Sequence, residues 1–168
     1  MEYRKAIAGD VERIWQILQG AIAQRKADGS TQWQDGYPNM ATVKTDIKHG
    51  YGYVFTQAGV IVGYAAVIFD KEPAYEAIEG NWLTDGAYVV VHRVAVAKDA
   101  TGKGVATAIM KAVEQIALAN AVHSIKVDTN FDNFAMLKIL DRLGYTYCGE
   151  VYFRGTPRKA YEKVLSSN

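Results

Sequence analysis

The residues best suited to chemistry lie between Tyr88 and Asn120, where a predicted strand leads through a glycine-rich turn into a predicted helix. β-branched residues dominate up to Val96, and an amphipathic pattern resumes after Gly104. Gly102 and Gly104 flank a single residue in the turn. Glycines let the backbone approach a ligand closely, and the N–H groups at a helix start attract anions. This pattern predicts a diphosphate-binding turn; the alternative is a plain connection between strand and helix.

Two other phosphate loops do not match this turn. A Walker loop has Ser or Thr after Gly-Lys, whereas Gly104 follows Gly102-Lys103, and its first glycine would fall at Ala97. The dinucleotide-binding fingerprint needs a third glycine where Thr107 stands. We therefore expect backbone N–H groups in a different local sequence to hold the phosphates.

His92 is the candidate for proton transfer, because an imidazole can accept a proton near neutral pH. Strict alternation along the predicted strand would put it on the same face as Val94 and Val96. The alternative is a structural histidine with a hydrogen-bond partner in the fold. If His92 does not act, a chain of water molecules could carry the proton to a carboxylate. The carboxylates considered for this route are Glu72, Glu76 and Asp128.

Two predicted loops carry aromatic side chains that could bind a substrate. The aromatic residues concerned are Trp33, Tyr37, Tyr75 and Trp82. The first loop, Ser30–Asn39, either lines a pocket or is fixed to the surface by its rings. The second, Asp70–Gly86, also holds five acidic residues against one basic residue. It is either an acidic approach for a cationic substrate or a solvated connection.

The composition excludes several classes of protein. The 168 residues carry a net charge of +1, with 49% hydrophobic and 22% charged residues, and we expect a single domain over residues 1–168. No basic stripe favours nucleic acid, and no apolar segment approaches membrane-spanning length. Cys148 is the only cysteine, which excludes an internal disulfide and a cysteine-rich metal site. We expect a cytoplasmic protein that uses no metal.

The order of the predicted elements indicates a mixed α/β fold. The strands are predicted over residues 2–7, 51–56, 60–69, 88–96, 124–128, 145–153 and 158–165. The helices are predicted over residues 10–28, 39–50, 104–120 and 133–144. The third helix joins the strands before and after it as a parallel βαβ unit. We expect a mostly antiparallel sheet of about seven strands flanked by about four helices.

The glycine-rich turn resembles a signature of the GCN5-related N-acetyltransferases, the GNAT superfamily. That signature is Gln/Arg-x-x-Gly-x-Gly/Ala after a strand that ends in small-apolar-Val. Here Thr101-x-x-Gly104-x-Ala106 follows Val94-Ala95-Val96. The glycine and the small residue match, and Thr101 departs from the pattern.

A second signature of this family, Asn-x-x-Ala followed by Tyr-x-x-x-Gly-Phe, is similar to the segment after the 124–128 strand. Asn133 and Gly144-Tyr145 fit with the correct spacing. Met136 stands in place of the alanine and Leu140 in place of the tyrosine. The resemblance covers essentially the whole chain, and it implies the GNAT fold.

The resemblance further implies transfer of acetyl from acetyl-CoA directly to a primary amine, with the coenzyme held between two strands that splay apart. The residues that it implies for coenzyme binding are Val94, Ala95, Val96, Thr101, Gly102, Lys103, Gly104, Val105, Ala106, Thr107 and Asn133. The tyrosine that Leu140 replaces protonates the leaving thiolate in this family. Tyr145 and Tyr147 are nearby alternatives, with core packing as their other role. The catalytic candidates are thus His92, Glu76 and Tyr145.

The acceptor is left open by the sequence. The acidic segment leans towards a cationic small molecule such as a polyamine, an aminoglycoside-like compound or an amino-acid derivative, with a protein amine as the alternative. Other hypotheses are an acyl-CoA-binding sensor without turnover, motivated by Thr101 and Leu140, and an interaction domain without a ligand. Dimers are common in the family, and the C-terminal strands are where we look first for a homodimer contact.

Overall fold

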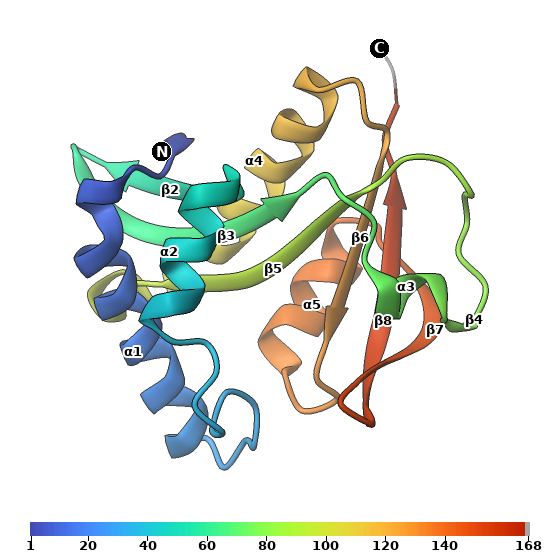
Figure 1. Cartoon of the computed structure of the whole chain (residues 1–168), viewed down its shortest axis with the longest axis horizontal. Coiled ribbons are helices and arrows are strands. Elements are labelled where there is room, and N and C mark those ends of the chain that lie inside the picture. The colour runs from blue at the N-terminus through green and yellow to red at the C-terminus, as the bar shows by residue number, and fades with distance from the viewer. Residues whose placement is uncertain (167–168) are drawn as a thin grey trace. The chain divides into compact units, whose positions relative to one another are not determined.

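The computed structural model describes residues 1–166, which contain eight strands and five α-helices (Figure 1). The strands are β1 Glu2–Lys5, β2 Gly52–Gln57, β3 Val60–Ile68, β4 Glu79–Gly80, β5 Val89–Val96, β6 Ser124–Thr129, β7 Thr146–Phe153 and β8 Thr156–Val164. The helices are α1 Val11–Ala27, α2 Met40–His49, α3 Pro73–Glu76, α4 Val105–Ala119 and α5 Phe134–Arg142. The strand order is β1-β2-β3-β5-β6-β8-β7-β4, with β5 and β6 parallel. The expected mixed and mostly antiparallel sheet is confirmed, and none of the helices in residues 1–166 is long and apolar enough to cross a membrane.

The chain forms two compact units. The N-terminal unit comprises Met1–Val67 and Arg93–Ala112. The C-terminal unit comprises Ile68–His92 and the described chain from Val113 onwards. Both β5 and α4 contribute residues to each unit.

In the N-terminal unit, helices cover both faces of β3. A Cβ at Gly63 would lie 2.7 Å from the Cδ1 atom of Ile109, so this residue faces α4. The next residue, Tyr64, points the other way, and its hydroxyl donates a hydrogen bond to Asp46 of α2 at 2.6 Å. The predicted buried face of α4 is confirmed at Val105 and Ile109, which are both buried.

Both ends of α2 are capped, whereas the start of α1 has no side-chain cap. Asn39 caps α2 by accepting a hydrogen bond from the N–H of Thr42 at 3.0 Å, and Gly50 ends the helix with φ 74°. Asp10 precedes α1 but does not cap it with its side chain. Its carboxylate instead accepts the N–H of Ile7 at 2.8 Å and both terminal nitrogens of Arg4.

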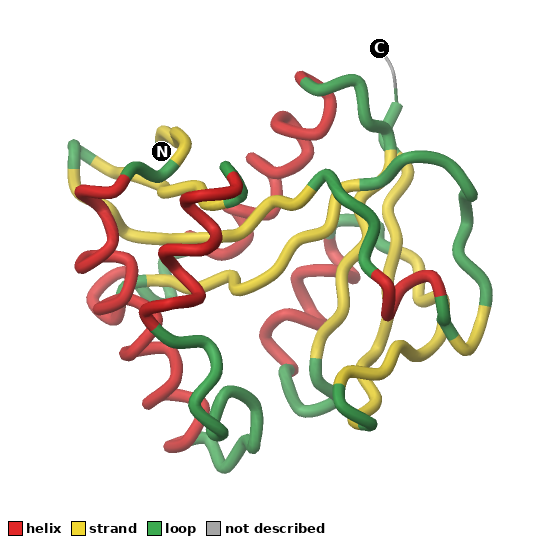
Figure 2. Tube along the Cα trace, viewed as in Figure 1, coloured by secondary structure: helices red, strands yellow, loops and turns green. Residues whose placement is uncertain are grey.

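In the C-terminal unit, the segment predicted as a loop over Asp70–Gly86 contains α3 and β4 (Figure 2). Glu72 caps α3 by accepting the N–H of Ala74 at 3.3 Å, and Pro73 occupies the first helical position. β4 pairs with β7 through Glu79 opposite Glu150 and Gly80 opposite Gly149.

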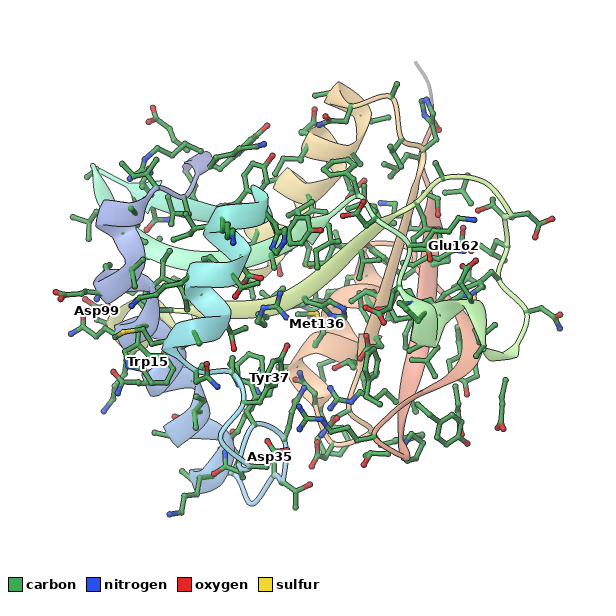
Figure 3. All side chains as sticks on the ribbon, in the orientation of Figure 1. Trp15, Asp35, Tyr37, Asp99, Met136 and Glu162 are labelled. Atoms are coloured by element: carbon green, nitrogen blue, oxygen red, sulfur yellow. The ribbon has the colours of Figure 1, made fainter. Side chains whose placement is uncertain are left out.

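Glu162 of β8 fixes the rest of this segment (Figure 3). Its carboxylate is fully buried and accepts hydrogen bonds from the N–H of Leu83 at 2.7 Å and from the hydroxyl of Thr84 at 2.5 Å. The hydroxyl of Ser124 in β6 donates to it at 2.6 Å. The N–H of Thr84 also donates to it at 3.4 Å. A buried carboxylate is stable only when hydrogen bonds replace water, and four donors do so here.

Candidate active site

His92 lies in the C-terminal unit between two carboxylates from different elements. Its Nε2 atom is 3.6 Å from Oε2 of Glu72, the capping residue of α3. Its Nδ1 atom is 3.8 Å from Oδ1 of Asp128, near the end of β6. The side chain of His92 is 18% exposed and that of Glu72 is 25% exposed, whereas that of Asp128 is 3% exposed. A partly accessible imidazole is thus flanked by an accessible and a buried carboxylate.

Two further side chains approach Asp128. The hydroxyl of Tyr75 donates a hydrogen bond to its Oδ1 atom at 2.5 Å. Nη1 of Arg158 lies 3.8 Å from its Oδ2 atom. Burial of the ring raises the pKa of Tyr75 well above its usual value, and the negative charge of Asp128 raises it further. Tyr75 therefore remains a protonated donor and keeps the Asp128 carboxylate in place.

Aromatic rings surround this cluster. Tyr75 is fully buried and packs against Trp82, with ring centroids 5.3 Å apart. The indole N–H of Trp82 donates to the backbone oxygen of Tyr75 at 2.7 Å. The His92 ring meets Tyr75 and Phe153 edge-on at 6.1 and 6.0 Å. Tyr75 and Trp82, both predicted to bind substrate, are therefore brought to the same cluster as His92.

Glu76 does not flank His92 but is linked to Glu72 through the side chain of Tyr88. It accepts a hydrogen bond from the hydroxyl of Tyr88 at 3.0 Å, and Lys71 lies 3.9 Å from it. The same Tyr88 hydroxyl accepts the N–H of Glu72 at 3.0 Å. Glu76 is thus joined to the His92 cluster through Tyr88, and the acids at His92 itself are Glu72 and Asp128.

The glycine-rich turn lies in the N-terminal unit, at the start of α4. Gly102 and Gly104 both have φ 76°, a conformation that residues with a Cβ rarely adopt. A Cβ at either position would meet no atom within 4 Å, and residues 101–104 are exposed. The first hydrogen bond of the helix runs from the N–H of Ala108 to the oxygen of Gly104. The amides of residues 105–107 therefore have no acceptor within the helix, and the turn in front of them is open.

Thr101, the departure from the family pattern, has a local structural role. Its hydroxyl donates to the backbone oxygen of Lys98 at 2.8 Å and so closes the preceding 3-10 turn. The side chain is exposed. The backbone of the turn is therefore shaped without the Gln or Arg of the family signature.

β5 contains a residue that the sequence did not reveal as special. Arg93 has φ 57°, a left-handed conformation inside a strand. The alternation that placed His92 on one face with Val94 and Val96 does not apply across such a residue. The ladder between β5 and β6 ends just before it, at Val91 opposite Val127. Residues 94–96, predicted to bind the coenzyme, lie beyond the end of that ladder.

The Arg93 side chain is fixed by a buried acid. Its guanidinium binds both oxygens of Asp46 in α2, at 2.9 and 2.6 Å. It also donates to the hydroxyl of Tyr37 at 2.5 Å. Figure 3 shows Tyr37 on the loop between α1 and α2. On the same loop, the buried ring of Trp33 lies 3.7 Å from the guanidinium carbon of Arg25.

The segment after β6 contributes two asparagines. Asn133, predicted from the family signature, caps α5 by accepting the N–H of Met136 at 3.3 Å. Oδ1 of Asn130 is buried and has no hydrogen-bond partner among the described residues. Asn130 lies in no motif of the sequence; the available signal was its place just after a parallel strand, where α/β proteins bind ligands.

Leu140, in the place of the family tyrosine, and the alternative Tyr145 are buried, whereas the alternative Tyr147 is 51% exposed. Leu140 is fully buried in the C-terminal unit. The hydroxyl of Tyr145 is also buried and has no hydrogen-bond partner within residues 1–166. Burial raises the pKa of Tyr145, and the charge of Glu114 raises it further. Tyr145 therefore keeps its proton at neutral pH.

The sequence matches the acetyltransferase (GNAT) family over residues 17–145. An acetyltransferase of this family from Streptococcus agalactiae is 36% identical, with a TM-score of 0.91 over 98% of this chain and 95% of that one. One from Listeria monocytogenes is 21% identical, with a TM-score of 0.78 over 98% and 94% of the two chains. The Salmonella typhimurium protein yncA, solved with its cofactor acetyl-CoA, is 18% identical, with a TM-score of 0.69 over 100% and 95%. The comparison with curated proteins gives no match. On the family match and the Streptococcus relative, the chain belongs to the acetyltransferase (GNAT) family.

Proposed function

We propose that the protein transfers the acetyl group of acetyl-CoA to the primary amine of a small-molecule acceptor. Membership of the acetyltransferase family supports the acetyl transfer. The observation that carries the choice of an amine acceptor is the placement of His92 between Glu72 and Asp128. Such a group can remove the proton that an amine must lose before it attacks.

The residues of the glycine-rich turn fit acetyl-CoA. Acetyl-CoA supplies an acetyl thioester, whose carbon–sulfur bond breaks as the acceptor nitrogen forms the amide. In our proposal the amides of residues 102–107 hold its diphosphate, because the turn is open where a Cβ would stand and is rich in N–H donors. Lys98 and Lys103 add positive charge next to them.

In our proposal His92 handles the proton of the acceptor amine. A free alkylamine has a pKa of ~10 and is mostly protonated at neutral pH, so it cannot attack until a base accepts its proton. The carboxylates of Glu72 and Asp128 then stabilise the positive imidazolium that forms. At 3.6 and 3.8 Å these contacts are longer than direct hydrogen bonds, which leaves room for a bridging water or a small shift of the ring.

Protonation of the leaving thiolate needs no dedicated side chain here. A thiol of pKa ~8.5 is a tolerable leaving group near neutral pH. Leu140 has no proton to give, and the hydroxyl of Tyr145 is buried without a hydrogen-bond partner among the described residues. We therefore expect slower turnover than with the family tyrosine, rather than none.

Calorimetric titration with acetyl-CoA, followed by thiol release with a panel of amines, tests the proposal. Wild-type protein should bind acetyl-CoA saturably, and Gly104→Glu should abolish binding by placing a carboxylate where the diphosphate lies. Gly86→Glu adds the same charge at an open glycine of the other unit and serves as the control. Absence of binding at millimolar acetyl-CoA would exclude the proposed function.

A second candidate, an acyl-CoA sensor without turnover, is favoured by the buried Leu140 in the place of the family tyrosine. A sensor should bind acetyl-CoA in the calorimetric titration as the enzyme does, but it should release no thiol with any amine. The two assays together therefore separate the enzyme from the sensor.

A further inference from the structure

Arg158 of β8 stands beside the His92 cluster with most of its hydrogen-bonding capacity unused. Its side chain is 24% exposed, and Nη1 lies 3.8 Å from Oδ2 of Asp128, which is beyond hydrogen-bond distance. Its Nε atom is buried without a hydrogen-bond partner in the described part of the chain. The guanidinium carbon lies 5.4 Å from the ring centroid of Phe153. A guanidinium without hydrogen-bond partners in the protein is suited to bind the acidic group of a ligand.

Asp128 does not occupy this guanidinium as a two-pronged partner. Its Oδ1 atom takes the short hydrogen bond from Tyr75 at 2.5 Å, and only Oδ2 faces Arg158. A carboxylate that fully satisfied Arg158 would receive two parallel N–H bonds, as Asp46 does from Arg93. The contrast between these two arginines indicates that Arg158 is placed for something other than Asp128.

Arg158 and His92 contact the same carboxylate from different sides. His92 lies against Oδ1 of Asp128 and Arg158 against Oδ2. Both also lie beside the ring of Phe153. A small molecule whose amine reaches His92 therefore has a guanidinium close to the carbon atoms next to that amine.

The acids of the segment over residues 70–86 are a poor site for a polycation. Glu72 faces His92, Glu76 accepts the Tyr88 hydroxyl, and Glu79 accepts the hydroxyl of Tyr152 at 3.0 Å. Three of the five acids thus have a partner within the fold, which weakens the argument for a polyamine.

We propose that Arg158 binds the carboxylate of the acceptor, which is an amino acid or a similar compound with a carboxylate near its amine. This rests on the proposed function and specifies its substrate class. Arg158 sets specificity, while His92 accepts the proton.

The experiment compares amino acids with the amines left when their carboxylates are removed. The pairs are leucine with 3-methylbutylamine, phenylalanine with 2-phenylethylamine, and lysine with pentane-1,5-diamine. We measure kcat/KM by thiol release for wild type, Arg158→Gln, Arg158→Lys and the exposed control Arg142→Gln. For the side chain that the enzyme accepts, wild type should prefer the amino acid by about 10²-fold or more, because the amine leaves Arg158 unpaired.

The variants identify the side chain that binds the carboxylate of the acceptor. Arg158→Gln should lower kcat/KM for the amino acid by about 10²-fold through KM and so remove its preference over the amine, with the acetyl-CoA affinity unchanged. Arg158→Lys should retain part of the preference for the amino acid, and the control Arg142→Gln should retain all of it. Equal wild-type rates with acid and amine, or a preference that survives Arg158→Gln, would overturn the proposal while leaving the acetyltransferase intact. No acetylation of either series would overturn both.

Discussion

His92 is placed by contacts that come from three elements of the C-terminal unit. Glu72 reaches it from the start of α3 and Asp128 from β6, while Phe153 at the end of β7 packs against its ring. Neither carboxylate is its neighbour in sequence. The proton-accepting role of His92 therefore depends on the packing of this unit rather than on a local motif.

Replacing His92 with Gln should lower kcat by about 10²- to 10³-fold, because a neutral amide cannot accept the amine proton. The affinity for acetyl-CoA, measured by calorimetry, should stay unchanged. His123→Gln, at an exposed histidine of the same unit, is the control and should retain full activity. A His92→Gln enzyme with unaltered kcat would exclude His92 as the base.

Replacing Asp46 with Ala should destabilise the protein by about 3–5 kcal/mol, because it leaves the buried guanidinium of Arg93 without its carboxylate. Urea unfolding measures the loss. The double variant Asp46→Leu, Arg93→Leu should lose less than the sum of the single changes, since it removes both charges. Additive losses would show that the pair does not interact.

Among single residues, the sequence identified His92 and the two glycines as candidates, but it did not identify the side chains that contact His92. His92 stood out because it is an imidazole in an apolar strand, and Gly102 and Gly104 because of their spacing. The carboxylates at His92 are Glu72 and Asp128 rather than Glu76, since the path of the chain through α3 decides which acid reaches the ring. Arg158 and the left-handed Arg93 carried no local signal, because both depend on contacts with distant residues.

Among the elements, the long periodic ones were predicted, whereas α3 and β4 were not. The apolar positions of α4 repeat at helical spacing, which fixes both its type and its buried face. α3 and β4 have four and two residues, too few for any period to show. They form because Glu72 caps the former and β7 pairs with the latter.

Replacing Gly149 with Ala should destabilise the contact of β4 with β7. Gly149 has φ 140°, and a Cβ there would overlap the backbone oxygen of Glu79 and lie 2.9 Å from Cα of Gly80. We expect a loss of about 2–4 kcal/mol in urea unfolding, from backbone strain together with this overlap. Gly86→Ala, at an open position without a positive φ, should change stability little. Equal effects of the two substitutions would contradict the argument.

The ion pair between Arg4 and Asp10, in the turn between β1 and α1, should make the free energy of unfolding fall as the pH becomes acidic. The Arg4 guanidinium lowers the pKa of Asp10 below its usual value, and the N–H of Ile7 acts in the same direction. A lowered folded-state pKa stabilises the fold above the unfolded pKa of ~3.9, and this contribution is lost as pH falls through the folded value. Asp10→Asn should cost about 1–2 kcal/mol at pH 7 and progressively less below about pH 4. A difference from wild type that stayed constant down to pH 2, measured by urea unfolding, would contradict this assignment.

For the molecule as a whole, acetyl-CoA should raise the thermal unfolding temperature. A ligand that binds only the folded state at about 100 times its Kd stabilises it by about 2.7 kcal/mol, which is roughly 5–10 °C for a chain of this size. Differential scanning calorimetry measures the shift. Gly104→Glu should show no shift, and Gly86→Glu should show the wild-type shift. Equal shifts in both variants would place the coenzyme away from the turn.

The short strand β4 also bears on aggregation. Without it, β7 would present a long unpaired edge, and such an edge can recruit strands from other molecules. β4 occupies two positions of that edge and brings Glu79 opposite Glu150, so that an incoming strand meets backbone already paired and two negative charges. The segment over residues 70–86, which places Glu72 beside His92, thus also covers part of the sheet edge. Substitutions made there to alter acceptor choice therefore carry a risk of fibre formation.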